Sequence, residues 1–120
     1  MSKILIVDDL PTEVQLMRSA IANLGHSTIV ATDGDQALEM AKRENPDLVL
    51  LDVVLPRMDG FQVCRKIKKD PQTASIPVIL VSSKTQESDK FWGLKQGASA
   101  YICKPFSPEE LADTVRKNIR

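Results

Sequence analysis

Short apolar runs alternate along the chain with longer segments in which apolar residues recur every three or four positions. The runs are typical of β-strands buried on both faces, and the recurring positions are typical of amphipathic helices. The pattern predicts five strand-then-helix pairs. The predicted strands are 4–7, 27–31, 48–52, 76–81 and 101–103. The predicted helices lie between Pro11 and Gly25, between Asp33 and Asn45, between Phe61 and Pro71, over 88–96, and from Pro108 to Ile119.

This alternation also predicts the fold. Apolar strands that alternate with helices indicate a parallel sheet covered by helices on both faces. Crossover connections are right-handed, which leaves few topologies. We expect an α/β fold, a three-layer αβα flavodoxin-like arrangement with five helices and a five-stranded parallel sheet in the order 2-1-3-4-5. No linker or repeat interrupts the pattern, so residues 1–120 are expected to form one domain without an effector domain.

Polar residues mark the start of two predicted helices. Asp33 with Gln36, and Ser107 with Glu110, have the spacing of a capping box, in which each side chain bonds the backbone of the other residue. We expect the strand 27–31 to lie at an edge of the sheet, because it is shorter and more polar than the others.

The charge balance narrows the possible partners. Sixteen Lys and Arg residues match sixteen Asp and Glu residues, so no net field attracts nucleic acid or an anionic membrane. The apolar run after Lys3 is too short for a signal peptide or a membrane span. We therefore expect a cytoplasmic protein with no membrane insertion and no direct nucleic-acid contact. Cys64 and Cys103 are expected to be core thiols rather than a disulfide.

Chemically active side chains stand where the predicted strands end. Asp8 and Asp9 end the first strand and Asp52 ends the third, while Ser82 and Lys104 follow the fourth and fifth. In a sheet of this order the first and third strands are neighbours, so three carboxylates converge at the edge where ligands bind. Their mutual repulsion would raise some of their pKa values unless a cation intervenes, and Mg²⁺ prefers such oxygen ligands.

The same residues suggest a reaction. Asp52 is placed to act as a nucleophile that forms an aspartyl phosphate. Lys104 would supply a positive charge, and Ser82 a hydroxyl, to phosphoryl oxygens. Asp8 and Asp9 could instead only cap the first helix, but a pair of acids that ends a buried strand favours metal binding. The set predicts metal-assisted phosphoryl transfer.

Five motifs in this order resemble the receiver domain of the two-component response regulators. The resemblance covers the whole chain, and the ordered set is specific where any single motif would not be. The motifs are Asp8-Asp9, Asp52-Val53-Val54-Leu55-Pro56-Arg57-Met58-Asp59-Gly60, Val81-Ser82-Ser83, Tyr101 and Lys104-Pro105-Phe106.

The resemblance implies a role for each acid. Asp52 would take a phosphoryl group from a histidine kinase, either CheA-like or hybrid. Asp9 and Asp52 would bind Mg²⁺ together with the backbone carbonyl of Val54. Asp8 would join the ion through a water molecule.

The resemblance also implies a conformational switch. Ser82 would move toward the phosphoryl group and let Tyr101 turn inward, which reshapes the face made by the fourth helix, the fifth strand and the fifth helix. Lys104 would precede a cis peptide bond at Pro105. Trp92, on the fourth helix, would either anchor a downstream protein or pack against a neighbouring helix.

Two features distinguish this chain within the family. The stretch 87–97 resembles single-domain regulators of the type IV pilus twitching-motility and phototaxis branch, and helical geometry turns its Trp92 away from the face of Phe91 and Leu94. Val54 and Lys84 replace the Asn and Glu of flagellar chemotaxis regulators. Both would border the path of attacking water, so fast self-hydrolysis is not inferred.

The leading hypothesis is a stand-alone response regulator in motility or taxis, whose only chemistry is its own phosphorylation and dephosphorylation. One alternative is a non-cycling scaffold that binds partners without phosphorylation. A flavin carrier would need a hydroxyl- and glycine-rich loop where this chain has Asp8-Asp9-Leu10-Pro11. A haloacid-dehalogenase-like phosphatase would need a second acid in the place of Val54.

Overall fold

The computed structural model describes residues 2–120 and contains a five-stranded parallel sheet in the order β2-β1-β3-β4-β5. The strands are β1 (Lys3–Val7), β2 (Ser27–Ala31), β3 (Leu48–Asp52), β4 (Val78–Ser82) and β5 (Ala100–Cys103). The α-helices are α1 (Pro11–Ile21), α2 (Gly34–Glu44), α3 (Gly60–Lys69), α4 (Glu87–Lys95) and α5 (Pro108–Asn118). The predicted strand order and the edge position of β2 are confirmed.

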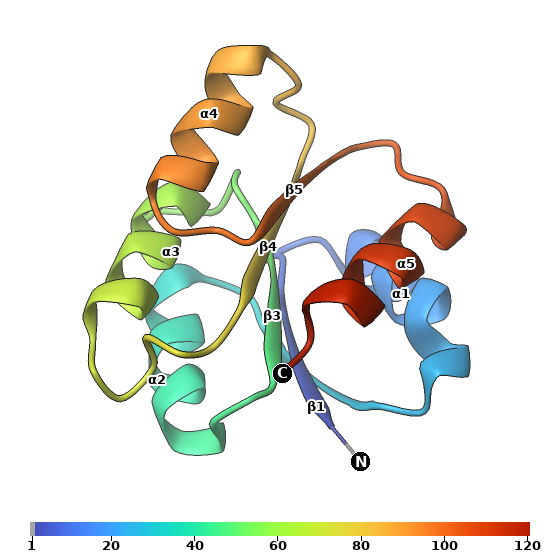
Figure 1. The fold of residues 1–120 in the computed structure, drawn as a ribbon, viewed down its shortest axis with the longest axis horizontal. Helices are drawn as coiled ribbons and strands as arrows, with labels where there is room; N and C mark the ends of the chain where they lie inside the picture. The colour runs from blue at the N-terminus through green and yellow to red at the C-terminus, as the bar shows by residue number, and fades with distance from the viewer. Residues whose placement is uncertain (1) are drawn as a thin grey trace.

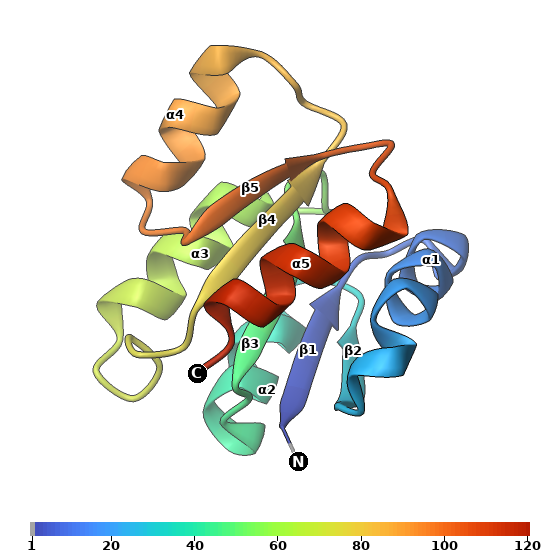
Figure 2. The same cartoon turned by 45° about the vertical axis from the view of Figure 1, so that its right-hand side comes forward.

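The helices form two layers around the sheet. Figure 1 shows α2 and α3 side by side on one face and α1 and α5 on the other. α4 lies over the β5 edge, as Figure 2 shows from a second direction. This arrangement is the predicted three-layer flavodoxin-like fold. Within the part of the chain that the structure describes, no helix combines the length and apolar composition of a membrane span.

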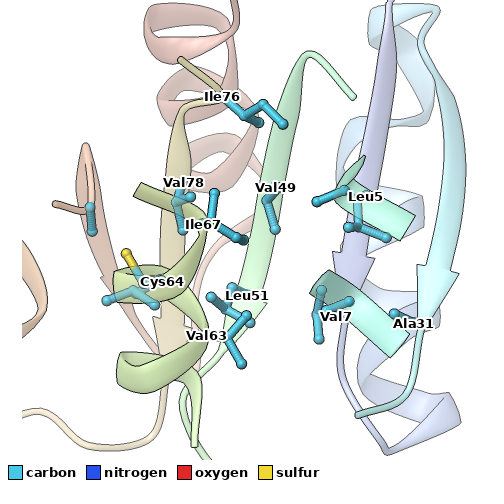
Figure 3. Close-up of a cluster of buried hydrophobic side chains, with 14 of the residues drawn as sticks. Leu5, Val7, Ala31, Val49, Leu51, Val63, Cys64, Ile67, Ile76 and Val78 are labelled. Atoms are coloured by element: carbon cyan, nitrogen blue, oxygen red, sulfur yellow. The ribbon is translucent and has the colours of Figure 1, made fainter. Parts of the chain in front are cut away.

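β3 is enclosed on both faces, which explains its continuous apolar run. Successive side chains of a strand point to opposite faces. Val49 and Leu51 belong to the core beneath α2 and α3, drawn in Figure 3. Leu48 and Leu50 belong to the core beneath α1 and α5. Because neither face meets water, every position of the strand before Asp52 needs an apolar side chain.

The helix starts differ in part from the predicted capping boxes. Asp33 accepts a hydrogen bond from the Gln36 N–H at 2.8 Å, but the Gln36 side chain accepts from Thr32 instead of Asp33. Ser107 accepts from the Glu110 N–H at 3.0 Å. Glu110 is exposed, so water solvates its carboxylate and the expected full box is only half formed.

Two further features correct the sequence analysis. α1 ends at Ile21 and continues as a short 3₁₀ turn, before Gly25 reverses the chain with a φ of 79°, a backbone conformation that favours glycine.

Cys64 is buried and burial raises its pKa to about 11, but Cys103 is only partly buried. Cys103 lies on the edge strand β5, which is covered less completely, so the expectation of two core thiols is wrong for Cys103.

Arg120 connects the end of α5 to two loops at the amino end of the sheet. Its guanidinium donates to Asn45 Oδ1 at 2.7 Å, to the Pro46 carbonyl at 3.0 Å and to Ser75 Oγ at 2.8 Å. Its backbone N–H donates to the Asp47 carbonyl at 3.3 Å. We call these contacts the Arg120 clasp.

Candidate functional site

Three carboxylates meet where β1 and β3 end. Asp52 is the last residue of β3, and Asp8 and Asp9 follow β1, the neighbouring strand. One oxygen of each acid lies within 4.8 Å of those of the other two. Asp8 is 0% exposed and Asp52 is 5% exposed, whereas Asp9 faces solvent. The parallel register therefore brings together the acids that the strand ends indicated.

Hydrogen bonds to the backbone fix Asp8. Its N–H donates to the Ala31 carbonyl of β2 at 3.1 Å, and its carboxylate accepts from the Leu10 N–H at 3.0 Å. The second bond fixes the turn from β1 into α1. The N-cap residue of α1 is Leu10, whose side chain makes no hydrogen bond to the helix. Neither Asp8 nor Asp9 is therefore the N-cap residue of α1, although the Asp8 carboxylate bonds the N–H of the residue that is.

Gly60 lets α3 begin against the backbone of β3. A Cβ at Gly60 would lie 2.2 Å from the Asp52 carbonyl oxygen and 2.7 Å from the Cα of Val53. The Gly60 N–H donates to the Val53 carbonyl at 2.8 Å. Asp59 and Gln62 form a full capping box at the start of the helix. The pair Asp59-Gly60 thus shapes the loop after Asp52, a role that the sequence analysis did not assign.

Lys104 brings the positive charge to this site. Its ammonium lies 3.2 Å from Asp8, 3.7 Å from Asp52 and 3.0 Å from Glu13, and its side chain is 13% exposed. The sequence analysis missed Glu13. Helical side chains lean toward the start of their helix, so an acid in the first turn after Asp8-Asp9 was the signal that could have identified it.

Burial and neighbouring charges set the protonation states. Burial raises the pKa of the Asp52 carboxyl from 3.8 to about 6, while the Lys104 ammonium opposes the rise and the Asp8 carboxylate adds to it. Burial alone would lower the pKa of Lys104, but the surrounding carboxylates, Glu13 foremost, outweigh it and raise that pKa. At neutral pH, Asp52 is therefore mostly ionised and Lys104 is protonated.

This donor set fits a divalent cation. Asp8, Asp9 and Asp52 offer only oxygen ligands, and two of these acids are buried beside a single ammonium, that of Lys104. Mg²⁺ takes such ligands and retains several waters, which the exposure of Asp9 to solvent permits. A bound cation would also lower the pKa of Asp52, because it favours the charged carboxylate.

Ser82 and Tyr101 both bind the backbone of Lys84. Ser82 ends β4 and is 0% exposed, and its Oγ accepts a hydrogen bond from the Lys84 N–H at 3.1 Å. The Tyr101 hydroxyl donates to the Lys84 carbonyl at 2.7 Å. Burial raises the pKa of Tyr101, which keeps its hydroxyl protonated at neutral pH. The loop at Lys84 therefore links the end of β4 to the aromatic ring of β5.

A cavity of about 920 Å³ opens beside the acids. Asp52 and Lys104 line it together with Leu16 of α1 and Phe106, which follows β5. Val54 also lines the cavity and is 54% exposed. The carboxylate of Asp52 is thus reached from a mainly apolar opening between α1 and the segment before α5.

α4 exposes its large apolar residues. Phe91 is 65% exposed, Trp92 49% and Leu94 50%. Gly93 is the buried residue of this helix, and a Cβ there would lie 2.9 Å from the ring of Tyr101. α4 therefore approaches the sheet through its glycine, and burial does not separate Trp92 from Phe91 and Leu94 as helical geometry suggested.

Residues 4–116 match the family described as "Response regulator receiver domain". The chain belongs to this family. Receiver domains are signalling modules and not classical enzymes, which removes the flavin-carrier and phosphatase alternatives. Receiver domains also bind Mg²⁺ at an acidic pocket, in agreement with the donor set of Asp8, Asp9 and Asp52.

Relatives of this receiver domain differ in length. It is 44% identical over 115 residues to Protein PilH of Pseudomonas aeruginosa, covering 96% of this chain and 95% of PilH. It is 41% identical to the alkaline phosphatase synthesis transcriptional regulatory protein PhoP of Bacillus subtilis, covering 98% of this chain and 48% of PhoP. The chain thus matches nearly all of one relative and about half of the other.

Solved structures share its backbone. The chemotaxis response regulator CheY4 of Vibrio cholerae has a TM-score of 0.89 at 30% identity, with 98% of each chain covered. A putative response regulator from Chloroflexus aurantiacus has a TM-score of 0.92 at 31% identity, covering 97% of this chain and 95% of the other. The peptide bond between Lys104 and Pro105 of this receiver domain is cis, as the family resemblance implied.

Proposed function

We propose that this receiver domain is a stand-alone response regulator of a two-component phosphorelay. It accepts a phosphoryl group on Asp52 from a histidine kinase, CheA-like or hybrid, with Mg²⁺ held by Asp8, Asp9 and Asp52. The observation that carries the proposal is the Lys104 ammonium, 3.2 Å from Asp8 and 3.7 Å from Asp52. The similarity to PilH over nearly the whole of both chains supports a stand-alone, cytoplasmic regulator in motility or taxis.

The Asp52 carboxylate is the nucleophile of this reaction. One of its oxygens attacks the phosphorus of a phosphohistidine, an O–P bond forms, and the P–N bond breaks as the imidazole leaves with the electron pair. A bound Mg²⁺, which the backbone carbonyl of Val54 would help the three acids to hold, would supply positive charge to offset the charge of the transferring group. Lys104 and Ser82 donate hydrogen bonds to the phosphoryl oxygens.

The output passes through the face formed by α4, β5 and α5. Ser82 Oγ accepts the Lys84 N–H through a lone pair, so its O–H can still donate to a phosphoryl oxygen, and a movement of Ser82 toward that oxygen shifts the loop at Lys84. The same loop accepts the hydrogen bond of Tyr101, so its movement changes the contact between Tyr101 and Gly93 of α4. The exposed Trp92 then anchors a downstream protein. The balanced charge of the chain favours a protein target over nucleic acid.

Acetyl phosphate with Mg²⁺ tests the phosphorylation step. We expect one phosphoryl adduct by intact-protein mass spectrometry, lost in Asp52→Asn and in wild type treated with EDTA. Asp35→Asn, which alters an exposed acid on α2, is the matched control and should leave the adduct intact. An adduct that survives in Asp52→Asn would contradict the proposed nucleophile.

A pull-down with and without beryllofluoride tests the output face. We expect beryllofluoride to change the set of bound proteins, and Trp92→Ala to remove that change. Glu39→Ala is the control, because Glu39 is exposed on α2, outside both α4 and the lining of the cavity beside Asp52. Full partner binding and biological function in Asp52→Ala would instead favour a scaffold that does not cycle.

A further inference from the structure

The ion pair between Lys104 and Glu13 has no part in the phosphoryl-transfer scheme. Glu13 Oε1 lies 3.0 Å from Lys104 Nζ, closer than Asp8 at 3.2 Å or Asp52 at 3.7 Å. The Glu13 side chain is 26% exposed, whereas those of Asp8 and Asp52 are 0% and 7% exposed. Lys104 is therefore shared between two buried acids and one acid nearer to solvent.

Lys104 and a divalent cation compete for the same carboxylates. The acids whose oxygens lie within 4.8 Å of one another are Asp8, Asp9 and Asp52, and two of them already contact Lys104. A cation bound there would stand beside the ammonium, and like charges repel strongly at short range away from water. The cation can bind tightly only if Lys104 withdraws from Asp8 and Asp52.

Glu13 offers the place to which Lys104 can withdraw. It lies in the first turn of α1, on an element that the Asp8–Leu10 hydrogen bond holds against the end of β1. Among the residues that the structure describes, the cluster of mutually close metal-ligating oxygens does not include Glu13. Its carboxylate thus remains available to the ammonium when a cation takes the other acids.

We propose that Glu13 is a positioning residue that retains Lys104 while Mg²⁺ occupies Asp8, Asp9 and Asp52. The inference rests on the proposed Mg²⁺ site and adds the residue that adjusts its affinity. After phosphorylation, a phosphoryl oxygen replaces Glu13 as the partner of Lys104, so the pair belongs to the unphosphorylated state.

Calorimetric titration of Mg²⁺ into the full chain tests the proposal without using phosphorylation. We expect Glu13→Gln to weaken Mg²⁺ binding about threefold, the size of effect typical of a partly exposed ion pair. Glu39→Gln is the matched control, because Glu39 is an exposed acid on α2 that also pairs with a basic residue, Arg43. It should bind Mg²⁺ as wild type does, and equal affinities of Glu13→Gln and wild type would overturn the proposal.

A second pair of titrations separates positioning from a plain charge effect. If Glu13 acts through Lys104, Glu13→Gln should have little effect when introduced into Lys104→Ala. If only the negative charge of Glu13 matters, Glu13→Gln should lower the Mg²⁺ affinity at least as much in Lys104→Ala as in wild type. No ammonium then offsets the charge of Glu13. This second result would overturn the positioning role.

The proposed function and the role of Glu13 can be tested separately. A wild-type protein that binds no Mg²⁺ would overturn both the proposed function and the role of Glu13. Normal Mg²⁺ binding without any phosphoryl adduct on Asp52 would overturn the proposed function alone, because the titrations of Glu13→Gln and Lys104→Ala would still decide the positioning role.

Discussion

Asp52 carries its charge at a position that water hardly reaches. Its side chain is 7% exposed, and the single ammonium of Lys104 lies 3.7 Å away. Burial raises its pKa from 3.8 to about 6. Between these two pH values, the folded protein retains a proton that the unfolded chain has released. The stability linked to this proton is present below the lower value and is lost as the pH rises through about 6.

We therefore predict that Asp52→Asn stabilises the metal-free protein. At pH 8 in EDTA, the free energy of unfolding should rise by about 2 kcal/mol, because the substitution removes a buried charge. The gain should shrink below pH 4, where the carboxyl of wild type is also neutral. Urea denaturation at both pH values measures it. A gain of equal size at pH 4 would assign the effect to packing instead of charge.

Val54 borders the cavity through which water would reach Asp52 once it carries the proposed phosphoryl group. It lines the cavity beside Asp52 and is 54% exposed, but its side chain offers water no hydrogen bond. We predict that Val54→Asn shortens the half-life of the phosphorylated protein by roughly threefold or more, because an amide can hold the attacking water. Loss of the adduct over time measures it. Val54→Ala is the control, and equal acceleration there would mean that space alone limits hydrolysis.

The contact between the end of β3 and the start of α3 depends on a glycine. The Gly60 position is so close to the Asp52 carbonyl oxygen that a Cβ would lie 2.2 Å from it. The obstacle is backbone, which cannot rotate away as a side chain can. The start of α3 and the strand that presents Asp52 are therefore fixed relative to each other.

We predict that Gly60→Ala destabilises the protein by about 2–4 kcal/mol, because the helix must shift away from β3. Gly25→Ala is the matched control. Gly25 has a φ of 79° but nothing within 4 Å of its Cβ position, so the loss there should be only about 1 kcal/mol. Denaturant unfolding compares the two variants, and equal losses would show that backbone conformation, not contact with β3, decides the effect at Gly60.

The strands that are buried on both faces could be predicted from the sequence. β1, β3 and β4 are enclosed on both faces, so they stand out as apolar runs, and their parallel arrangement places Asp8 and Asp52 together. Glu13 was not predicted, because its contact with Lys104 depends on how the chain turns from β1 into α1. The capping box at Glu110 was predicted but is only half formed, since the spacing does not reveal that water reaches the side chain.

At the scale of the whole molecule, the carboxyl and amino ends of the parallel strands carry different groups of side chains. The carboxyl edge holds Asp8 and Asp52, whose like charges repel each other, and Lys104, which pairs with both. The amino edge carries the Arg120 clasp, which joins α5 to the loop before β3 and to Ser75 before β4. The Arg120 clasp therefore adds its contribution to stability at the edge opposite the site.

We predict that Arg120→Ala lowers the free energy of unfolding by about 1 kcal/mol, because it removes several hydrogen bonds at once, of which the bond to the Pro46 carbonyl is partly buried. Arg116→Ala is the control, since Arg116 pairs with exposed Asp113 one turn away on α5, and it should change stability by less than about 0.5 kcal/mol. Denaturant unfolding measures both. Phosphorylation of Asp52 should proceed normally in Arg120→Ala at temperatures where it is folded.

Trp92 is the single tryptophan of the chain, and it is half exposed on α4, the helix that touches the sheet through Gly93. The tryptophan fluorescence of the chain therefore comes from one known position on the surface of α4. A protein that covers α4 would shift this emission and shield it from iodide, whereas a ligand confined to the acids of β1 and β3 would change it only by moving the helix. The chain thus carries a built-in optical probe of the proposed output face, and no label has to be attached.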